Sequence, residues 1–167
     1  MKELLLHMVT GFFGAFGFAF LFQTPKRSHF FIGITGMLGW TVNYLFQTFV
    51  GTGVPLDIVG NFLNGLILGI CAQIFGHIQK VSPTVYYITG VIPPVPGGTI
   101  YMMFYSLIVG EYAQAAVFLR SIIVITGSLA LGIFVASRIL GQFLGEPLYV
   151  DKKKAAHQHV VYKYSKH

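Results

Sequence analysis

The sequence predicts an all-α integral membrane protein with about five transmembrane helices, the fourth broken near mid-membrane. Apolar residues make up 54% of the 167 positions, charged residues only 10%, and the mean hydropathy is +0.71. A soluble domain of this length carries about a quarter charged residues. Five long apolar runs separated by short polar turns predict the spans, and prolines and glycines inside the fourth run predict its break.

Each apolar run is long enough to form a membrane-spanning helix, which needs about 20 residues. The first run lacks a small-residue cleavage site and is followed by basic residues, so we expect a retained helix rather than a signal peptide. We expect residues 1–144 to form one transmembrane domain and residues 145–167 a basic cytoplasmic tail. The predicted spans are Leu4–Phe22, Phe30–Val50, Leu56–Ile78, Thr84–Val109 and roughly Ala113–Leu140.

The distribution of basic residues predicts the orientation. An outside N-terminus places Lys26, Arg27, Lys80 and the tail lysines Lys152–Lys154 in the cytoplasm, as the positive-inside rule requires. We therefore expect an N-out, C-in, multi-pass protein of the plasma or inner membrane. These topology signals, together with contacts to anionic lipid headgroups, account for the net charge of +6 without a nucleic-acid partner.

Small residues in the first three spans predict close helix packing. The "GLILG" segment of the third span places Gly65 and Gly69 four residues apart, a spacing that lets helix backbones approach. Six glycines of the first two spans predict packing faces in the same way: Gly11, Gly14, Gly17, Gly33, Gly36 and Gly39.

Amide side chains inside the second and third spans are candidate substrate-binding residues. Asp57, Asn61 and Asn64 share one helical face, because they recur at i, i+4 and i+7. Asn43 lies deep in the second span. Two interpretations stay open for the asparagines: they join helices by hydrogen bonds, or they line a substrate pathway. Asp57 lies near the outer mouth and is also explained as a solvated end residue.

The segment "ITGVIPPVPGGTIY" interrupts the fourth span near its middle. Its halves, 84–92 and 99–109, each correspond to about 15 Å of helix. Unpaired amides that open the second half attract an anion, and carbonyls that end the first half accept hydrogen bonds from an ammonium group. Transporters bind carboxylates at such breaks; a simple packing kink is the alternative. The candidate substrate-binding residues here are Pro93, Pro96, Gly97, Gly98 and Thr99.

Arg120 is the remaining candidate, about two turns into the last span, where a cation is costly unless it is paired or hydrated. It either binds a substrate carboxylate, snorkels outward, or pairs with Glu111 or Asp57. No catalytic constellation, phosphate loop or metal-ligand set is present in the spans, so we expect neither an enzyme nor a cofactor nor a metal site. The histidines of the tail are expected to be solvated.

Two motifs resemble the threonine/serine exporter family. They are "SPTVYYITGVIPPVPGGTIY" and "FLFQTPKRSHFFIGITGMLGW", and the likeness covers essentially residues 4–144. The chain is similar to the small, C-terminal-type half of that family, whose signature maps onto Pro93, Pro96 and Gly97. The resemblance implies export of threonine and serine, or of dicarboxylates such as succinate. It also implies a larger five-span partner subunit with a soluble domain.

The leading hypothesis is therefore a subunit of a secondary transporter that exports small hydrophilic metabolites by alternating access. The break would hold the substrate carboxylate, and Arg120 and the asparagines would complete the pocket. The chain would act with the larger subunit, or as a homo-oligomer, in contact with membrane lipid. A channel or pore subunit and a non-transporting membrane assembly protein are the alternatives.

Overall fold

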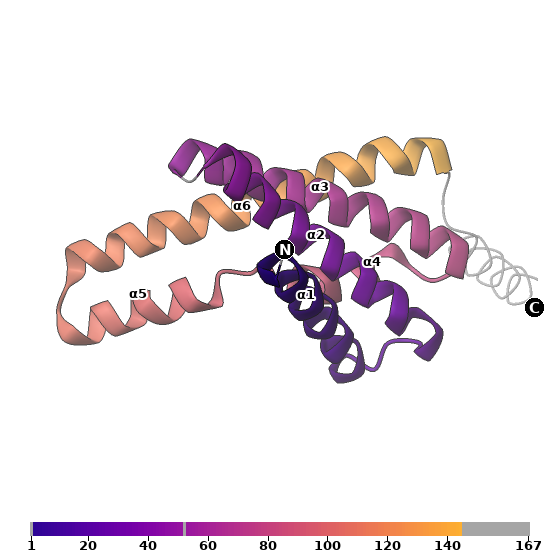
Figure 1. The fold of residues 1–167 in the computed structure, drawn as a ribbon, viewed down its shortest axis with the longest axis horizontal. Helices are drawn as coiled ribbons and strands as arrows, with labels where there is room; N and C mark the ends of the chain where they lie inside the picture. Colours follow the sequence, from indigo (N-terminus) through magenta and orange to yellow (C-terminus); the bar gives the residue numbers. More distant parts are fainter. Residues whose placement is uncertain (1, 52, 145–167) are drawn as a thin grey trace, which may run out of the picture.

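The computed structural model describes residues 2–51 and 53–144, and this part of the chain is all helical. The expected tail, 145–167, lies outside the described residues. A short 3-10 helix, η1 (Lys26–Ser28), precedes the second long helix. The α-helices in chain order are α1 (Lys2–Leu21), α2 (His29–Val50), α3 (Val54–Gln79), α4 (Pro83–Val91), α5 (Gly97–Val109) and α6 (Tyr112–Leu144), as Figure 1 shows.

Proline and glycine set several helix ends. Pro55 and Pro83 lie in the first turns of α3 and α4, where the missing amide hydrogen costs nothing. Gly51 ends α2 with φ 106°, and Gly110 ends α5 with φ 88°. A side chain is strained in that left-handed region, so glycine permits these tight turns.

Small residues bring the helices into close contact, as the sequence predicts. On α2, Gly36 lies against Ala15 of α1, and on α3, Gly65 lies against the backbone carbonyl of Leu129 in α6. Gly17 is the exception among the glycines expected to pack: it is exposed, and a Cβ added there would meet nothing within 4 Å. The α1–α2 and α3–α6 pairs are the most extensive helix contacts.

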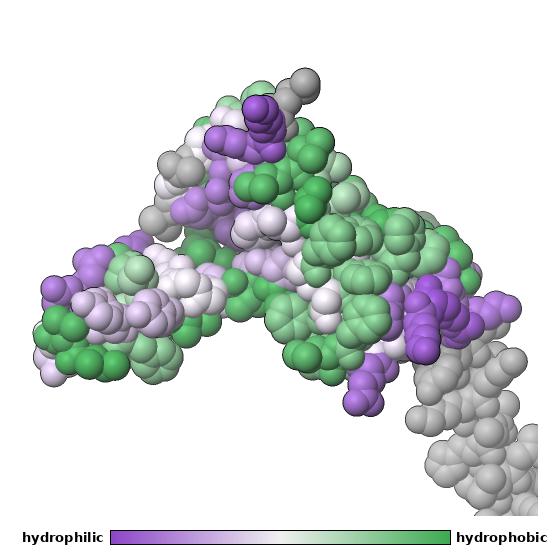
Figure 2. All heavy atoms as spheres, turned by 60° about the horizontal axis from the view of Figure 1, so that its bottom comes forward, coloured by the Kyte–Doolittle hydropathy of each residue, from purple (hydrophilic) through white to green (hydrophobic). Residues whose placement is uncertain are grey.

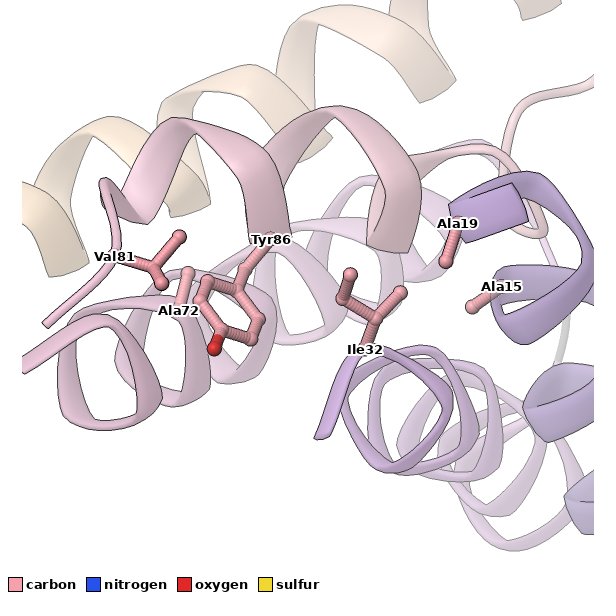
Figure 3. Packing of buried hydrophobic residues seen from close by; sticks show 6 residues of the cluster. All are labelled: Ala15, Ala19, Ile32, Ala72, Val81 and Tyr86. Atoms are coloured by element: carbon pink, nitrogen blue, oxygen red, sulfur yellow. The ribbon is translucent and has the colours of Figure 1, made fainter. Parts of the chain in front are cut away.

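An apolar core joins the first four helices. The α4 residue Tyr86 is fully buried, and Figure 3 shows its ring together with Ile32 of α2 and Ala72 of α3. Ala15 and Ala19 of α1 complete this apolar cluster. The core fixes α4 among α1, α2 and α3, and so fixes the position of the segment that follows α4.

The α5 helix and the first part of α6 extend away from this core. Figure 1 shows them as a hairpin projecting from the bundle, and α5 packs mainly on α6. Ser106 is the buried residue of α5, whereas most of its large apolar side chains are exposed. Figure 2 shows broad hydrophobic areas on the molecular surface, as expected of helices that face lipid or another membrane chain.

Three of the described helices are long and apolar enough to cross a membrane: Lys2–Leu21, Pro55–Gln79 and Tyr112–Phe143. The α2 helix has 22 residues and comparable length, but it contains several polar side chains. The prediction of an all-α membrane protein is confirmed. The count of five crossings and the N-out orientation stay predictions.

Candidate functional site

The chain leaves helical geometry between α4 and α5, in the segment with the three prolines. The α4 helix ends at Val91 and α5 begins at Gly97. Pro94 is buried, and Pro93 packs on α1: a Cβ added at Gly14 would lie 3.4 Å from the Pro93 Cγ. The prolines therefore end one helix, and the contact of Pro93 with α1 fixes the position of the junction on that side.

The first turn of α5, at the far end of the junction from α4, presents free backbone amides. Pro96 is the residue before the helix, and its carbonyl accepts the first helical hydrogen bond, from Ile100, at 3.0 Å. The Gly97 amide donates to the Val95 carbonyl at 2.7 Å, so it is not free to bind an anion. The amides of Gly98 and Thr99 have no hydrogen-bond partner among the described residues, and such groups at a helix start attract an anion.

The two glycines of the junction are open to their surroundings. Both are exposed, and a Cβ at either position would meet nothing within 4 Å. Neither has a positive φ. Crowding and backbone strain within the described chain therefore do not require glycine at 97 or 98. The space beside both glycines is therefore open to a group from outside the described chain.

A row of amide side chains lies between α2 and α3. The Asn43 amide donates to the Asn61 Oδ1 at 3.5 Å, and the Gln47 amide donates to the Asn43 Oδ1 at 3.3 Å. Asn61 also donates to the backbone carbonyl of Asp57 at 2.8 Å. Asn43 and Asn61 are buried, and the hydrogen bond between them joins the two helices, whereas the other two bonds lie within α2 and within α3. This supports the helix-joining interpretation for both residues.

Asn64 is different, because its side chain is fully buried and neither its Oδ1 nor its Nδ2 has a partner in the described residues. It faces α2 at Gly39, where an added Cβ would lie 2.5 Å from the Asn64 Oδ1. Leaving a buried amide unpaired costs about 1–3 kcal/mol. The helix-joining interpretation therefore does not account for Asn64, whose amide keeps its hydrogen-bonding capacity unused within the described part of the chain.

Arg120 lies at a separate site on α6. Its side chain is exposed, and together with Asp57 of α3 it lines a cavity of about 130 Å³. The rest of the lining comes from α6, including Ser121 and Val124. Opposite charges therefore face one small space from two helices.

The candidate residues thus occupy three places. Asn64 lies near the last turn of α4, because Leu68, one turn beyond Asn64, lies beside both Gly39 and Gly90 of α4. The cavity at Arg120 contains no junction residue and none of the three asparagines. The predicted single pocket is therefore not assembled within the described part of this chain, and Asp57 alone connects the amide row with the Arg120 cavity.

A second polar cluster, between α1 and α2, was missed by sequence reasoning. The Trp40 indole donates to the His7 Nδ1 at 3.0 Å, and the His7 ring stacks on Tyr44 with centroids 4.1 Å apart. The Tyr44 hydroxyl donates to Glu3 at 3.1 Å. These partners are 33 and 41 positions apart, and no local spacing signals such pairs. No group of three potential metal ligands occurs among the described residues.

Apolar outer surfaces, an apolar core and a few buried amide side chains define an all-helical membrane protein. The chain belongs to the threonine/serine exporter family: the family model described as Threonine/Serine exporter, ThrE, matches residues 7–139. The resemblance found in the two motifs is thereby confirmed. No curated protein and no solved structure gives a significant match.

Proposed function

We propose that this chain is a subunit of a secondary transporter that exports small hydrophilic metabolites, either threonine and serine or a dicarboxylate such as succinate. Membership of the exporter family supports the transport function. The buried amide of Asn64, which has no partner in the described residues, supports a polar route through an otherwise apolar molecule.

In this proposal the chain crosses the plasma or inner membrane five times, with its N-terminus outside. The α4 and α5 helices, of 9 and 13 residues, are the halves of the fourth crossing. At 1.5 Å per residue they span about 14 and 20 Å, so together they cover the roughly 30 Å hydrocarbon core. The junction then lies inside the membrane, where non-helical backbone must be covered by protein or water.

The observation that carries the proposal is the pair of free amides at Gly98 and Thr99. They open α5 next to glycines with empty space above them. A substrate carboxylate would accept hydrogen bonds from these amides, and the positive end of the helix dipole would add to its binding. The carbonyls that end α4 would accept hydrogen bonds from an ammonium group. Broken helices of transporters bind substrates and coupling ions in this way.

The transporter would need a second chain to enclose the junction. Gly97 and Gly98 are exposed, and the projecting α5–α6 hairpin has apolar faces without a partner among residues 2–51 and 53–144. We propose that the larger subunit of the same family covers this side, with a second copy of this chain as the alternative. A channel subunit or an assembly protein would expose a similar hairpin, so transport itself must be measured.

The test is exchange in proteoliposomes that contain this chain alone or with the larger subunit. Radiolabelled threonine, serine and succinate would be loaded inside, and the same unlabelled compounds added outside. We expect saturable exchange of at least one of them when both chains are present. Conductance without counterflow would favour a channel, and no flux from a correctly folded complex would favour an assembly protein.

A further inference from the structure

We propose that Asp57 and Arg120 form a subsite for the charged backbone of an α-amino acid, and that this subsite selects an amino acid over a dicarboxylate. The inference rests on the proposed transport function and chooses between its two substrate classes. Asp57 would bind the ammonium group and Arg120 the carboxylate. The subsite is distinct from the α4–α5 junction.

Close packing of α3 and α6 fixes the relative position of the two charges. The α3 residues Gly65 and Gly69 contact α6 at Leu129 and Ala136, so the two helices run in the same direction. Asp57 lies two turns before Gly65, and Arg120 lies about the same distance before Leu129. Both side chains therefore reach the same level of the helix pair, near the start of α3.

The space between these side chains fits a small polar ligand. The cavity of about 130 Å³ is many times the roughly 10–15 Å³ that one water needs. The structure records no ion pair within 4.0 Å between these two described residues, so the opposite charges face the cavity without meeting each other. Ser121 adds a hydroxyl to the lining. A zwitterion placed there would be paired at both ends.

A dicarboxylate fits this arrangement poorly. The guanidinium of Arg120 matches one carboxylate in a bidentate pair, but the second carboxylate would face the like charge of Asp57. An amino acid has one charge of each sign and avoids this repulsion. With the predicted N-out orientation, the start of α3 lies at the outer side, so the subsite would hold an exported amino acid at the point of release.

The test compares ligands that each lack one of the two charged groups. Exchange of threonine would be competed with threonine, with 3-hydroxybutyrate, which lacks the ammonium group, and with threoninamide, which lacks the carboxylate. Succinate would serve as the dicarboxylate. The variants are Asp57→Asn, Arg120→Gln and the double variant. Glu111→Gln and Arg138→Gln are matched controls, because both residues are exposed and outside the cavity lining.

We expect the wild type to prefer threonine over 3-hydroxybutyrate by about tenfold or more, the loss expected when a charged hydrogen bond is removed. Asp57→Asn should bring this ratio towards one, and Arg120→Gln should do the same for threonine against threoninamide. The double variant should be the weakest. The controls should keep the wild-type ratios.

Three results would overturn the inference. The first is that the single variants leave the preference for threonine over 3-hydroxybutyrate and over threoninamide unchanged. The second is that the double variant regains wild-type behaviour, which would indicate a structural charge pair. The third is that the wild type prefers succinate to threonine. Titration calorimetry of threonine on the purified full chain separates this inference from the proposed function. If the chain binds ligands with the expected ratios but gives no exchange, the subsite is supported and transport is contradicted. If exchange occurs but the variants leave the ligand ratios unchanged, transport is supported and the subsite is contradicted.

Discussion

Replacing Gly98 with tryptophan is expected to lower substrate exchange by roughly tenfold or more, the loss that about 1.4 kcal/mol of binding energy produces. The indole would fill the open space above the free amides of Gly98 and Thr99, where the substrate carboxylate is proposed to bind. The fold should persist, because a Cβ added at Gly98 meets no neighbour within 4 Å and the backbone φ is not positive. Exchange in proteoliposomes and the thermal midpoint in detergent measure the two effects.

Two further variants control this result. Gly17→Trp introduces the same side chain at another exposed glycine with nothing within 4 Å, and it should exchange normally. Gly98→Ala should fold at least as well as the wild type, since alanine favours a helix over glycine by up to about 1 kcal/mol. Normal exchange by Gly98→Trp would mean that the junction does not hold the substrate. An unfolded or dissociated complex would indicate a packing role instead.

Replacing Gly65 with leucine is expected to separate α3 from α6 and to destabilise the protein by about 3 kcal/mol or more. A Cβ at this position would overlap the backbone carbonyl of Leu129, and backbone atoms cannot move aside as a flexible side chain can. Because this helix contact is among the most extensive in the molecule, the damage should be global. The thermal midpoint and the elution profile in detergent would report it.

Gly127→Leu is the matched control for this variant. Gly127 is in α6, the helix against which Gly65 packs, but it is exposed and a Cβ there meets nothing within 4 Å. We expect its thermal midpoint to stay close to the wild-type value. A Gly65→Leu protein as stable as Gly127→Leu would contradict the described packing of α3 on α6.

Hydrophobicity and turn chemistry were enough to predict the helices. The second run was predicted as Phe30–Val50 and α2 is His29–Val50, because the apolar run ends at the flexible Gly51. The predicted halves were 84–92 and 99–109, and the chain is not helical between Val91 and Gly97, since proline cannot continue a helix. That this interval breaks one membrane crossing stays a prediction. The projecting hairpin of α5 and α6 could not be predicted, because packing between distant segments decides it.

The candidate site was only partly predictable for the same reason. Helical spacing placed Asn61 and Asn64 on one face of α3, but spacing could not reveal that Asn61 is paired while Asn64 is not. That difference depends on α2, which presents Asn43 to the first residue and Gly39 to the second. Asp57 was interpreted as part of the asparagine face or as a solvated end residue, and as one of two possible partners of Arg120. That Asp57 and Arg120 line one cavity follows from the packing of α3 on α6.

The most direct measurement is substrate protection of a single cysteine at the junction. Gly98→Cys in a Cys71→Ser background leaves one thiol in the chain, since Cys71 is its one natural cysteine. The rate of its reaction with a maleimide would be followed in exchange-competent proteoliposomes. We predict that a saturating concentration of the exchanged substrate slows labelling by roughly tenfold, whereas a non-exchanged solute has no effect. Equal labelling rates with and without substrate, in a preparation that still exchanges, would contradict a substrate site at this junction.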